Sequence, residues 1–188
     1  MPGRRLRCAW VHALLLLLLL PLSPAWAQQP TTAGANGVLT AEEAPLKAAF
    51  LYNFVLYASW PSMPAEGLTM CVLGQDDMGP AFDALAGKLI HGKSVKVRRL
   101  AQRPSRADEC QLLFVAASQH AAMPAVSHAL QGLPVLIVAD AGAYAPELPM
   151  IMLEREGSRL VFQVNLGLAR AAGLRLDPKL LRLAKVVR

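Results

Sequence analysis

The cysteines are the residues of this chain whose type and spacing could most readily do covalent chemistry. Three occur, and Cys8 lies ahead of the apolar core of an N-terminal leader, so it cannot serve as a lipoprotein anchor. Cys71 and Cys110 remain once the leader is removed, and they lack the CxxC spacing of redox-catalytic or zinc-binding pairs. An even number of cysteines in an exported chain predicts a disulfide bond between them; the other interpretation is two buried, reduced thiols.

The histidines and a glycine-containing turn do not complete a catalytic motif. His120 and His128 are eight residues apart on one predicted helix, about 12 Å, which is too far to share a metal ion. The segment from Gly74 to Gly79 has two glycines at P-loop spacing, but Pro80 and Ala81 stand where Lys and Ser or Thr would hold phosphate and magnesium. No HExxH or GxSxG motif occurs. We therefore predict that the protein is not an enzyme and holds no cofactor or metal.

Four other residues could form a binding surface. Trp60 ends an aromatic helix, and the favoured interpretation of Phe50, Phe54 and Tyr57 on that helix is that they pack in a core. Asn165 stands where a helix cap is expected, and Arg170 and Arg175 follow near the end of that helix, where the other interpretation is compensation of the helix dipole. Arginine and aromatic side chains are favoured anchors in interfaces. We predict a partner-binding patch of Asn165, Arg170 and Arg175 with aromatic support from Trp60.

The N-terminal segment and the net charge indicate the compartment. Residues 1–27 combine an arginine-rich start, a short apolar run and small residues at Ala25 and Ala27, the pattern of a cleaved signal peptide. The run is about half of the roughly 20 residues that a membrane span requires, so we expect no embedded anchor. Cleavage lowers the net charge from +6 to +3, which argues against nucleic-acid binding. Residues 28–39 are predicted to be a flexible segment ahead of one domain, residues 40–188.

The elements that must position these residues alternate between apolar strands and helices. Near-continuous apolar runs predict strands that are covered on both faces. We expect a three-layer α/β sandwich with a mixed, largely parallel sheet and a C-terminal β-hairpin followed by helix. The predicted strands are 68–73, 88–100 with a turn at Gly92, 111–117, 134–139, and the hairpin 150–153 and 159–164; the predicted helices are 40–60, 76–85, 118–130, 166–172 and 177–187.

An ordered set of short segments resembles the YfiR-type domains of exported bacterial proteins. The set begins with the aromatic helix and its Trp-Pro ending, continues through two Cys-containing strands, and closes with two leucine-rich motifs. The resemblance extends over residues 44–187. The matching segments are Lys47–Phe54 with Trp60-Pro61, Cys71–Gly74, Gly87-Lys88, Gly92, Val95–Leu100, Cys110–Phe114, Phe162–Leu166, Ala172–Leu174 and Leu180–Ala184.

This resemblance implies a periplasmic repressor that binds the periplasmic sensor part of a YfiN-like inner-membrane diguanylate cyclase and lowers cyclic-di-GMP signalling. It also implies release by a YfiB-like outer-membrane lipoprotein and a tendency to form homodimers. The sequence departs from the family pattern at Glu147–Ile151 and at Asp177–Lys179, which leaves the partner's identity open. The alternative function is that of a periplasmic small-molecule-binding receptor. A periplasmic enzyme would need a reactive constellation that assembles only in space.

Overall fold

The computed structural model describes residues 43–75, 78–100, 107–142 and 145–188. The predicted signal peptide, the segment 28–39 and the acidic pair Asp76 and Asp77 lie outside these residues. Within the described ranges, no helix is both long enough and apolar enough to cross a membrane.

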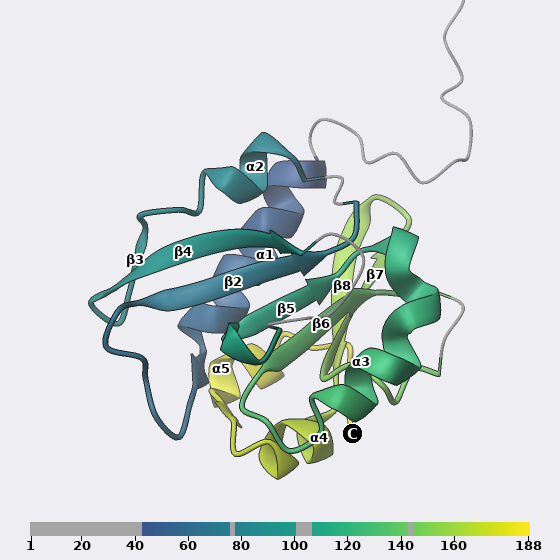
Figure 1. Ribbon diagram of the computed structural model, residues 1–188. Coiled ribbons are helices and arrows are strands. Elements are labelled where there is room, and N and C mark those ends of the chain that lie inside the picture. The colour runs from purple at the N-terminus through teal and green to yellow at the C-terminus, as the bar shows by residue number, and fades with distance from the viewer. Residues whose placement is uncertain (1–42, 76–77, 101–106, 143–144) are drawn as a thin grey trace, which may run out of the picture. The chain divides into compact units, whose positions relative to one another are not determined.

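Eight strands form one sheet in the order β10-β8-β7-β6-β5-β2-β4-β3 (Figure 1). Strands β4, β2, β5, β6 and β7 run parallel to one another, and the described antiparallel pairs within this sheet are β3–β4 and β7–β8. The predicted mixed, largely parallel sheet is confirmed. Its strands are β2 (Leu68–Leu73), β3 (Leu89–Ile90), β4 (Lys93–Leu100), β5 (Leu112–Val115), β6 (Leu136–Asp140), β7 (Ile151–Glu156), β8 (Arg159–Val164) and β10 (Val186–Val187).

Helices cover both faces of the sheet, so the predicted three layers are present. Alternate residues of a strand point to opposite faces. On β2, Met70 and Val72 pack into the core beneath helix α1, whereas Cys71 and Leu73 pack into a second core with helix α3. The helices are α1 (Glu43–Leu56), α2 (Pro80–Asp83), α3 (Met123–Ala129), α4 (Leu166–Ala171) and α5 (Pro178–Leu181).

The first core depends on the aromatic face of α1. Phe54 is fully buried, and its ring lies edge-on to Phe162 of β8 with centroids 5.1 Å apart. Phe50 contacts both rings in the same edge-on geometry, with both centroid distances 5.9 Å. Such pairs add to the stabilisation from area burial alone. These contacts pack strand β8 against α1. Phe50 and Phe54 are four residues apart and therefore lie on the same face of the helix.

Several predicted boundaries were wrong. The predicted helix 177–187 stops at Leu181, and its last residues form the short strand β10, whose pairing with β8 outweighs local helix propensity. The predicted helix 118–130 begins instead as a 3₁₀ segment, Ala117–Ala122, because Pro124 suits only the first turn of the α-helix that follows. The two-residue ribbon of β1 (Ala58–Ser59) and β9 (Arg175–Leu176) was not predicted.

Candidate functional site

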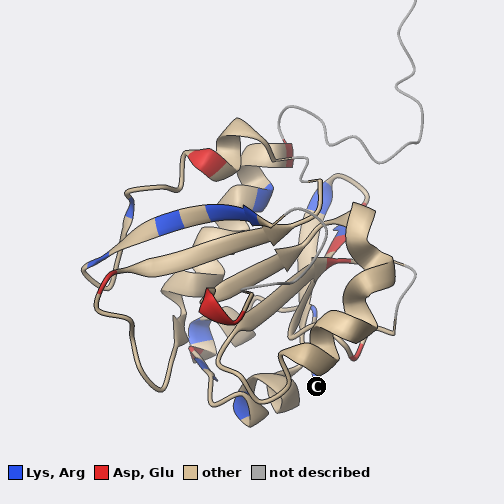
Figure 2. Ribbon diagram, viewed as in Figure 1, with Lys and Arg blue, Asp and Glu red and all other residues tan. Residues whose placement is uncertain are grey.

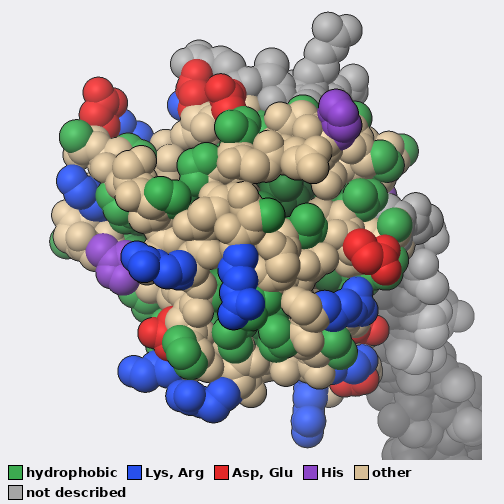
Figure 3. All heavy atoms as spheres, turned by 90° about the horizontal axis from the view of Figure 1, so that it is seen from below, with side chains coloured by type: hydrophobic (Ala, Val, Ile, Leu, Met, Phe, Trp, Pro, Cys, Tyr) green, Lys and Arg blue, Asp and Glu red, His purple; other side chains and the backbone are tan. Residues whose placement is uncertain are grey.

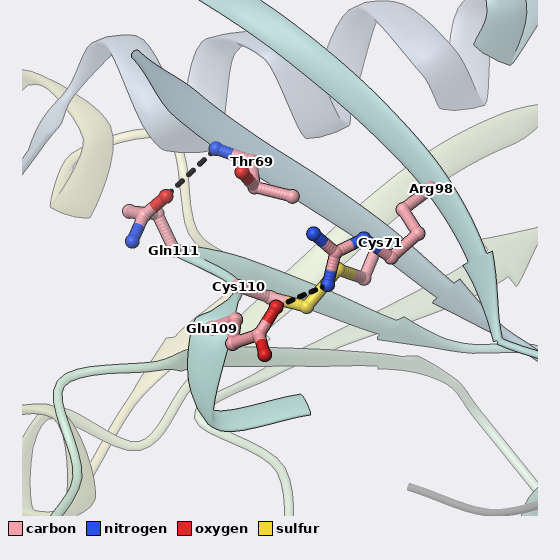
Figure 4. The surroundings of a disulfide bond; sticks show 6 residues. All are labelled: Thr69, Cys71, Arg98, Glu109, Cys110 and Gln111. Atoms are coloured by element: carbon pink, nitrogen blue, oxygen red, sulfur yellow. Dashed lines mark hydrogen bonds and ion pairs between the residues drawn. A yellow bond between two sulfur atoms is a disulfide. The ribbon is translucent and has the colours of Figure 1, made fainter. Parts of the chain in front are cut away.

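The predicted disulfide bond between Cys71 and Cys110 is confirmed (Figure 4). Cys71 lies on β2, and Cys110 lies just before β5, the strand that pairs with β2 in parallel. Their Cα atoms are 6.0 Å apart, and both side chains are buried. Burial removes the sulfur atoms from solvent, so this bond is suited to holding the strands together rather than to thiol exchange.

Polar contacts flank the disulfide at the surface. The Thr69 amide donates to the Gln111 side-chain oxygen at 2.7 Å, and the Arg98 guanidinium donates to Glu109 at 2.7 Å (Figure 4). These contacts join β2, β4 and the segment that leads into β5. The disulfide therefore belongs to a region in which three neighbouring segments are tied together by covalent and polar bonds.

The carboxyl ends of β2, β4, β5, β6 and β7 finish at one edge of the sheet, here called the carboxyl edge. Open α/β sheets bind ligands at this edge, where the strand order reverses. The reversal occurs at β2, because β4 lies on one side of it and β5 on the other. This geometry makes the carboxyl edge the first place to look for a site.

A buried ion pair occupies part of the carboxyl edge. Lys47 of α1 donates to Asp140 at the end of β6 at 2.9 Å, and the two side chains are 5 % and 19 % exposed. The ammonium group also lies 5.6 Å from the centre of the Phe114 ring. Lys47 falls on the same face of α1 as the buried Leu51 and Phe54, so helical geometry directs its charge inward. The pair ties the start of α1 to the sheet.

His120 lies beside this ion pair. Burial lowers the pKa of His120 from its ordinary value; Asp140 opposes the change and Lys47 reinforces it. Gly142 closes over the ring, because a Cβ atom there would lie 2.0 Å from the His120 Nδ1 atom. The imidazole is therefore held in a position that disfavours its cationic form.

The turn after β2 also packs closely against the 3₁₀ segment Ala117–Ala122. The Gln75 amide donates to Ser118 Oγ at 2.9 Å. Gly74 has φ 94°, and a Cβ atom there would lie 2.4 Å from the Gln119 side chain, so only glycine fits. Among the residues that the structure describes, no group of three or more His, Cys, Asp or Glu side chains could hold a metal ion. At this edge Lys47 binds Asp140, and the Gln75 amide binds Ser118.

The predicted patch residues lie at the opposite edge, here called the amino edge. Strand β8 runs antiparallel to β7 and so delivers Asn165 and α4 to this edge. Ser59 of β1 pairs with Arg175 of β9. Trp60 directly follows Ser59 in the chain and so lies close to Arg175. The amino edge thus brings together two segments that are more than 100 residues apart in sequence.

The four patch residues differ in exposure. Trp60 is 6 % exposed and packs in the core. Asn165 caps α4: its side chain accepts from the Leu168 amide at 3.1 Å and donates to the Glu147 carbonyl at 3.2 Å. The Arg170 and Arg175 side chains are exposed, and in the described part of the chain they make no hydrogen bond or ion pair. The arginines are the members that remain open to a partner.

Sequence reasoning missed the Lys47, Asp140 and His120 cluster. A weak signal was present, since Lys47 interrupts an apolar helix face and Asp140 directly follows a buried strand. Neither residue forms a motif, because the contact joins positions 93 residues apart. Only the tertiary fold brings the cluster together.

These features define a class of protein: a three-layer α/β domain with a disulfide bond between β2 and the segment before β5, and with exposed cations at its amino edge. Within that class, the family model described as YfiR/HmsC-like matches residues 44–185, which is more than half of the chain. The protein belongs to the YfiR/HmsC-like family.

Proposed function

We propose that the protein is an exported periplasmic repressor of an inner-membrane diguanylate cyclase and lowers cyclic-di-GMP signalling. The match of residues 44–185 to the YfiR/HmsC-like family carries this proposal. The disulfide bond supports an oxidising compartment, because such bonds persist in the periplasm and are rare in the cytosol. The leader pattern of residues 1–27 supports export.

The protein acts by binding in this proposal rather than by catalysis. Its partner is the periplasmic sensor part of a YfiN-like cyclase, and the contact includes Arg170 and Arg175, with Asn165 fixing α4 and Trp60 supporting the surface from the core. Exposed arginine side chains that lack an internal acceptor are available to carboxylates of a partner. A YfiB-like outer-membrane lipoprotein releases the cyclase by competing for the repressor, and a homodimer is the expected form of the free protein.

Deletion and complementation test this function. We expect deletion of the gene to raise cellular cyclic-di-GMP, measured by mass spectrometry of cell extracts, and to increase biofilm. The full chain with its own leader should restore the parental level, whereas a chain lacking residues 1–27 should not, since it stays in the cytosol. Unchanged cyclic-di-GMP after deletion would contradict the repressor function.

A second candidate, a periplasmic small-molecule receptor, is favoured by one observation. The strand order reverses at β2, and open α/β sheets bind ligands outside the carboxyl ends of their strands at such a point. In a receptor, solute binding at this edge would be the primary event and any effect on a cyclase would be indirect. Thermal unfolding of the purified protein with a panel of periplasmic solutes separates the two: a solute that raises the melting temperature favours the receptor, and no shift across the panel favours the repressor.

A further inference from the structure

Positive charge is concentrated at the C-terminal end of the sequence. Residues 159–188 contain seven Lys and Arg residues and one acid, Asp177. Residues 28–158 contain nine basic and twelve acidic residues, so the excess positive charge of the mature chain lies entirely in its last 30 residues. The positive charge is therefore localised, and it would attract a partner surface of opposite, negative charge.

The structure places four of these cations on neighbouring short elements of the amino edge. Arg170 lies on α4, Arg175 on β9, Lys179 on α5, and Arg182 is the residue that ends α5. All four are exposed, and among the described residues their side chains make no hydrogen bond or ion pair. Together they are called the cationic face. Figure 3, seen from below, shows Lys and Arg side chains spread over this side of the molecule with hydrophobic side chains among them.

The basic residues of β4 provide an internal comparison (Figure 2). There Lys96 lies 3.6 Å from Glu66, Arg98 lies 2.7 Å from Glu109, and Arg99 pairs with Asp83. The fold thus supplies a carboxylate to each of these three cations. It supplies none to the four of the cationic face within the described chain.

Two acidic residues and one exposed leucine lie near the cations of this face. The Asp177 carboxylate accepts from the Lys179 amide at 2.7 Å and is engaged in capping α5. Glu147 is exposed beside Asn165, whose side chain binds its carbonyl. Leu183, next to Arg182, is 72 % exposed and adds one apolar side chain to the face. An apolar side chain among cations suits an acidic surface that also offers hydrophobic contact.

We propose that the cationic face, with Leu183, docks onto an acidic surface of a protein partner. The partner's identity, the periplasmic sensor part of the cyclase, rests on the proposed function; the acidic character of its surface does not. Three of the four cations are arginines, whose planar donor fork matches a carboxylate in two-point contact. The single exposed leucine on this face is too little apolar area for insertion into a bilayer. The geometry therefore favours protein carboxylates over an anionic lipid surface.

A binding assay tests the surface without the cyclase. The probes are fluorescein-labelled poly-L-glutamate and vesicles of phosphatidylethanolamine and phosphatidylglycerol. The protein is expressed as the full chain, exported with its own leader and purified from the periplasm. We expect poly-L-glutamate binding to fall by about tenfold or more in the variant R170E/R175E/K179E/R182E and to weaken steeply with salt in the parent. The neutral variant R170Q/R175Q/K179Q/R182Q should lose binding too, which shows that lost attraction, and not repulsion by the new carboxylates, causes the fall.

A matched control carries the same change in net charge elsewhere. The variant K88E/K93E/K96E/R159E reverses four cations outside the cationic face and should bind the probe more tightly than the cationic-face reversal. Equal losses in the two variants would show attraction by net charge alone and overturn the proposal. Sedimentation of the parent with vesicles, without poly-L-glutamate binding, would overturn it in favour of a membrane surface.

A suppressor selection tests the partner. The cationic-face reversal should raise cyclic-di-GMP in cells, and suppressors in the periplasmic part of the cyclase should replace Asp or Glu by neutral or basic residues. Suppressors confined to apolar positions would overturn the electrostatic contact. If deletion of the whole gene leaves cyclic-di-GMP unchanged, the proposed function fails, and the poly-L-glutamate assay still decides whether the surface binds carboxylates.

Discussion

The two edges of the sheet use charged residues in opposite ways. At the carboxyl edge, Lys47 and Asp140 are largely withdrawn from water and bind each other at 2.9 Å, with His120 beside them. At the amino edge, Arg170 and Arg175 stand in solvent, without an internal partner in the described chain. Buried charges that pair internally contribute to holding elements together, whereas exposed cations contribute little to stability and remain available for binding.

This difference reverses the usual expectation for an open α/β sheet. Such folds place their ligands at the carboxyl ends of parallel strands. Here two described pairs at that edge, Lys47 with Asp140 and Gln75 with Ser118, bind each other, and the Cys71–Cys110 bond secures β2 to the segment before β5. The exposed arginine side chains without an internal partner in the described chain, Arg170 and Arg175, lie on short C-terminal elements at the opposite edge. Under the proposed function, the amino edge meets the partner and the paired charges of the carboxyl edge help to hold the fold together.

The largest effect on stability is expected from removing the disulfide bond. The variant C71A/C110A should lower the free energy of unfolding by about 4 kcal/mol, because the bond closes a long loop whose entropy is restored in the unfolded chain. Urea unfolding followed by far-UV circular dichroism measures the change. With dithiothreitol the parent should fall to the level of the variant. Equal stability of parent and variant without reductant would show that the bond does not secure this region.

Breaking the buried ion pair should have the next largest effect. Lys47→Met keeps the apolar stem but leaves the Asp140 carboxylate without its cation, and we expect a loss of about 2 kcal/mol, reduced from the fully buried case because Asp140 is 19 % exposed. The exposed pair of Lys96 and Glu66 provides the matched control. Lys96→Met should cost less than about 0.5 kcal/mol by the same urea assay. Similar losses in the two variants would show that the buried Lys47–Asp140 pair contributes no more to stability than the exposed Lys96–Glu66 pair.

The sequence was sufficient for the parts of this fold that repeat a simple pattern. Buried apolar runs predicted β2, β5 and β6, and Gly157 in the predicted hairpin turn has φ 61°, as a tight turn requires. The disulfide was predictable because only two cysteines remain once the predicted leader is set aside. Patterns of a few residues fix local structure without reference to the rest of the chain.

The remaining features depend on contacts that no local pattern encodes. Strand β10 forms because Val186 and Val187 pair with the end of β8, although the leucine-rich segment before them predicted a continued helix. The two-residue ribbon of β1 and β9 has too few residues for any periodicity. Trp60 was predicted from its residue type to support a surface, and its 6 % exposure follows from the packing of that ribbon. Exposure is set by tertiary structure, so residue type alone cannot assign it.

A smaller, pH-dependent effect is expected at His120. Its pKa is lowered in the folded protein, chiefly by burial, so the unfolded chain binds a proton more readily. The stability contributed by the neutral ring is therefore complete above about pH 6.5 and is lost as the pH falls from there toward the folded pKa. Urea unfolding at pH 7 and pH 5.5 should show lower stability at the acidic pH. His120→Gln should weaken that dependence, whereas His128→Gln, an exposed control on α3, should retain it.

The smallest effect on stability is expected for the arginines of the amino edge. The double variant R170A/R175A should change the free energy of unfolding by less than about 0.5 kcal/mol, because both side chains are exposed and make no internal bond among the described residues. The same variant should nevertheless release the cyclase and raise cyclic-di-GMP in cells that express it from the native locus. Asn165→Ala serves as the contrasting control, since loss of the α4 cap should lower stability by about 1 kcal/mol. An R170A/R175A protein that folds normally and represses as well as the parent would show that the amino-edge arginines take no part in binding.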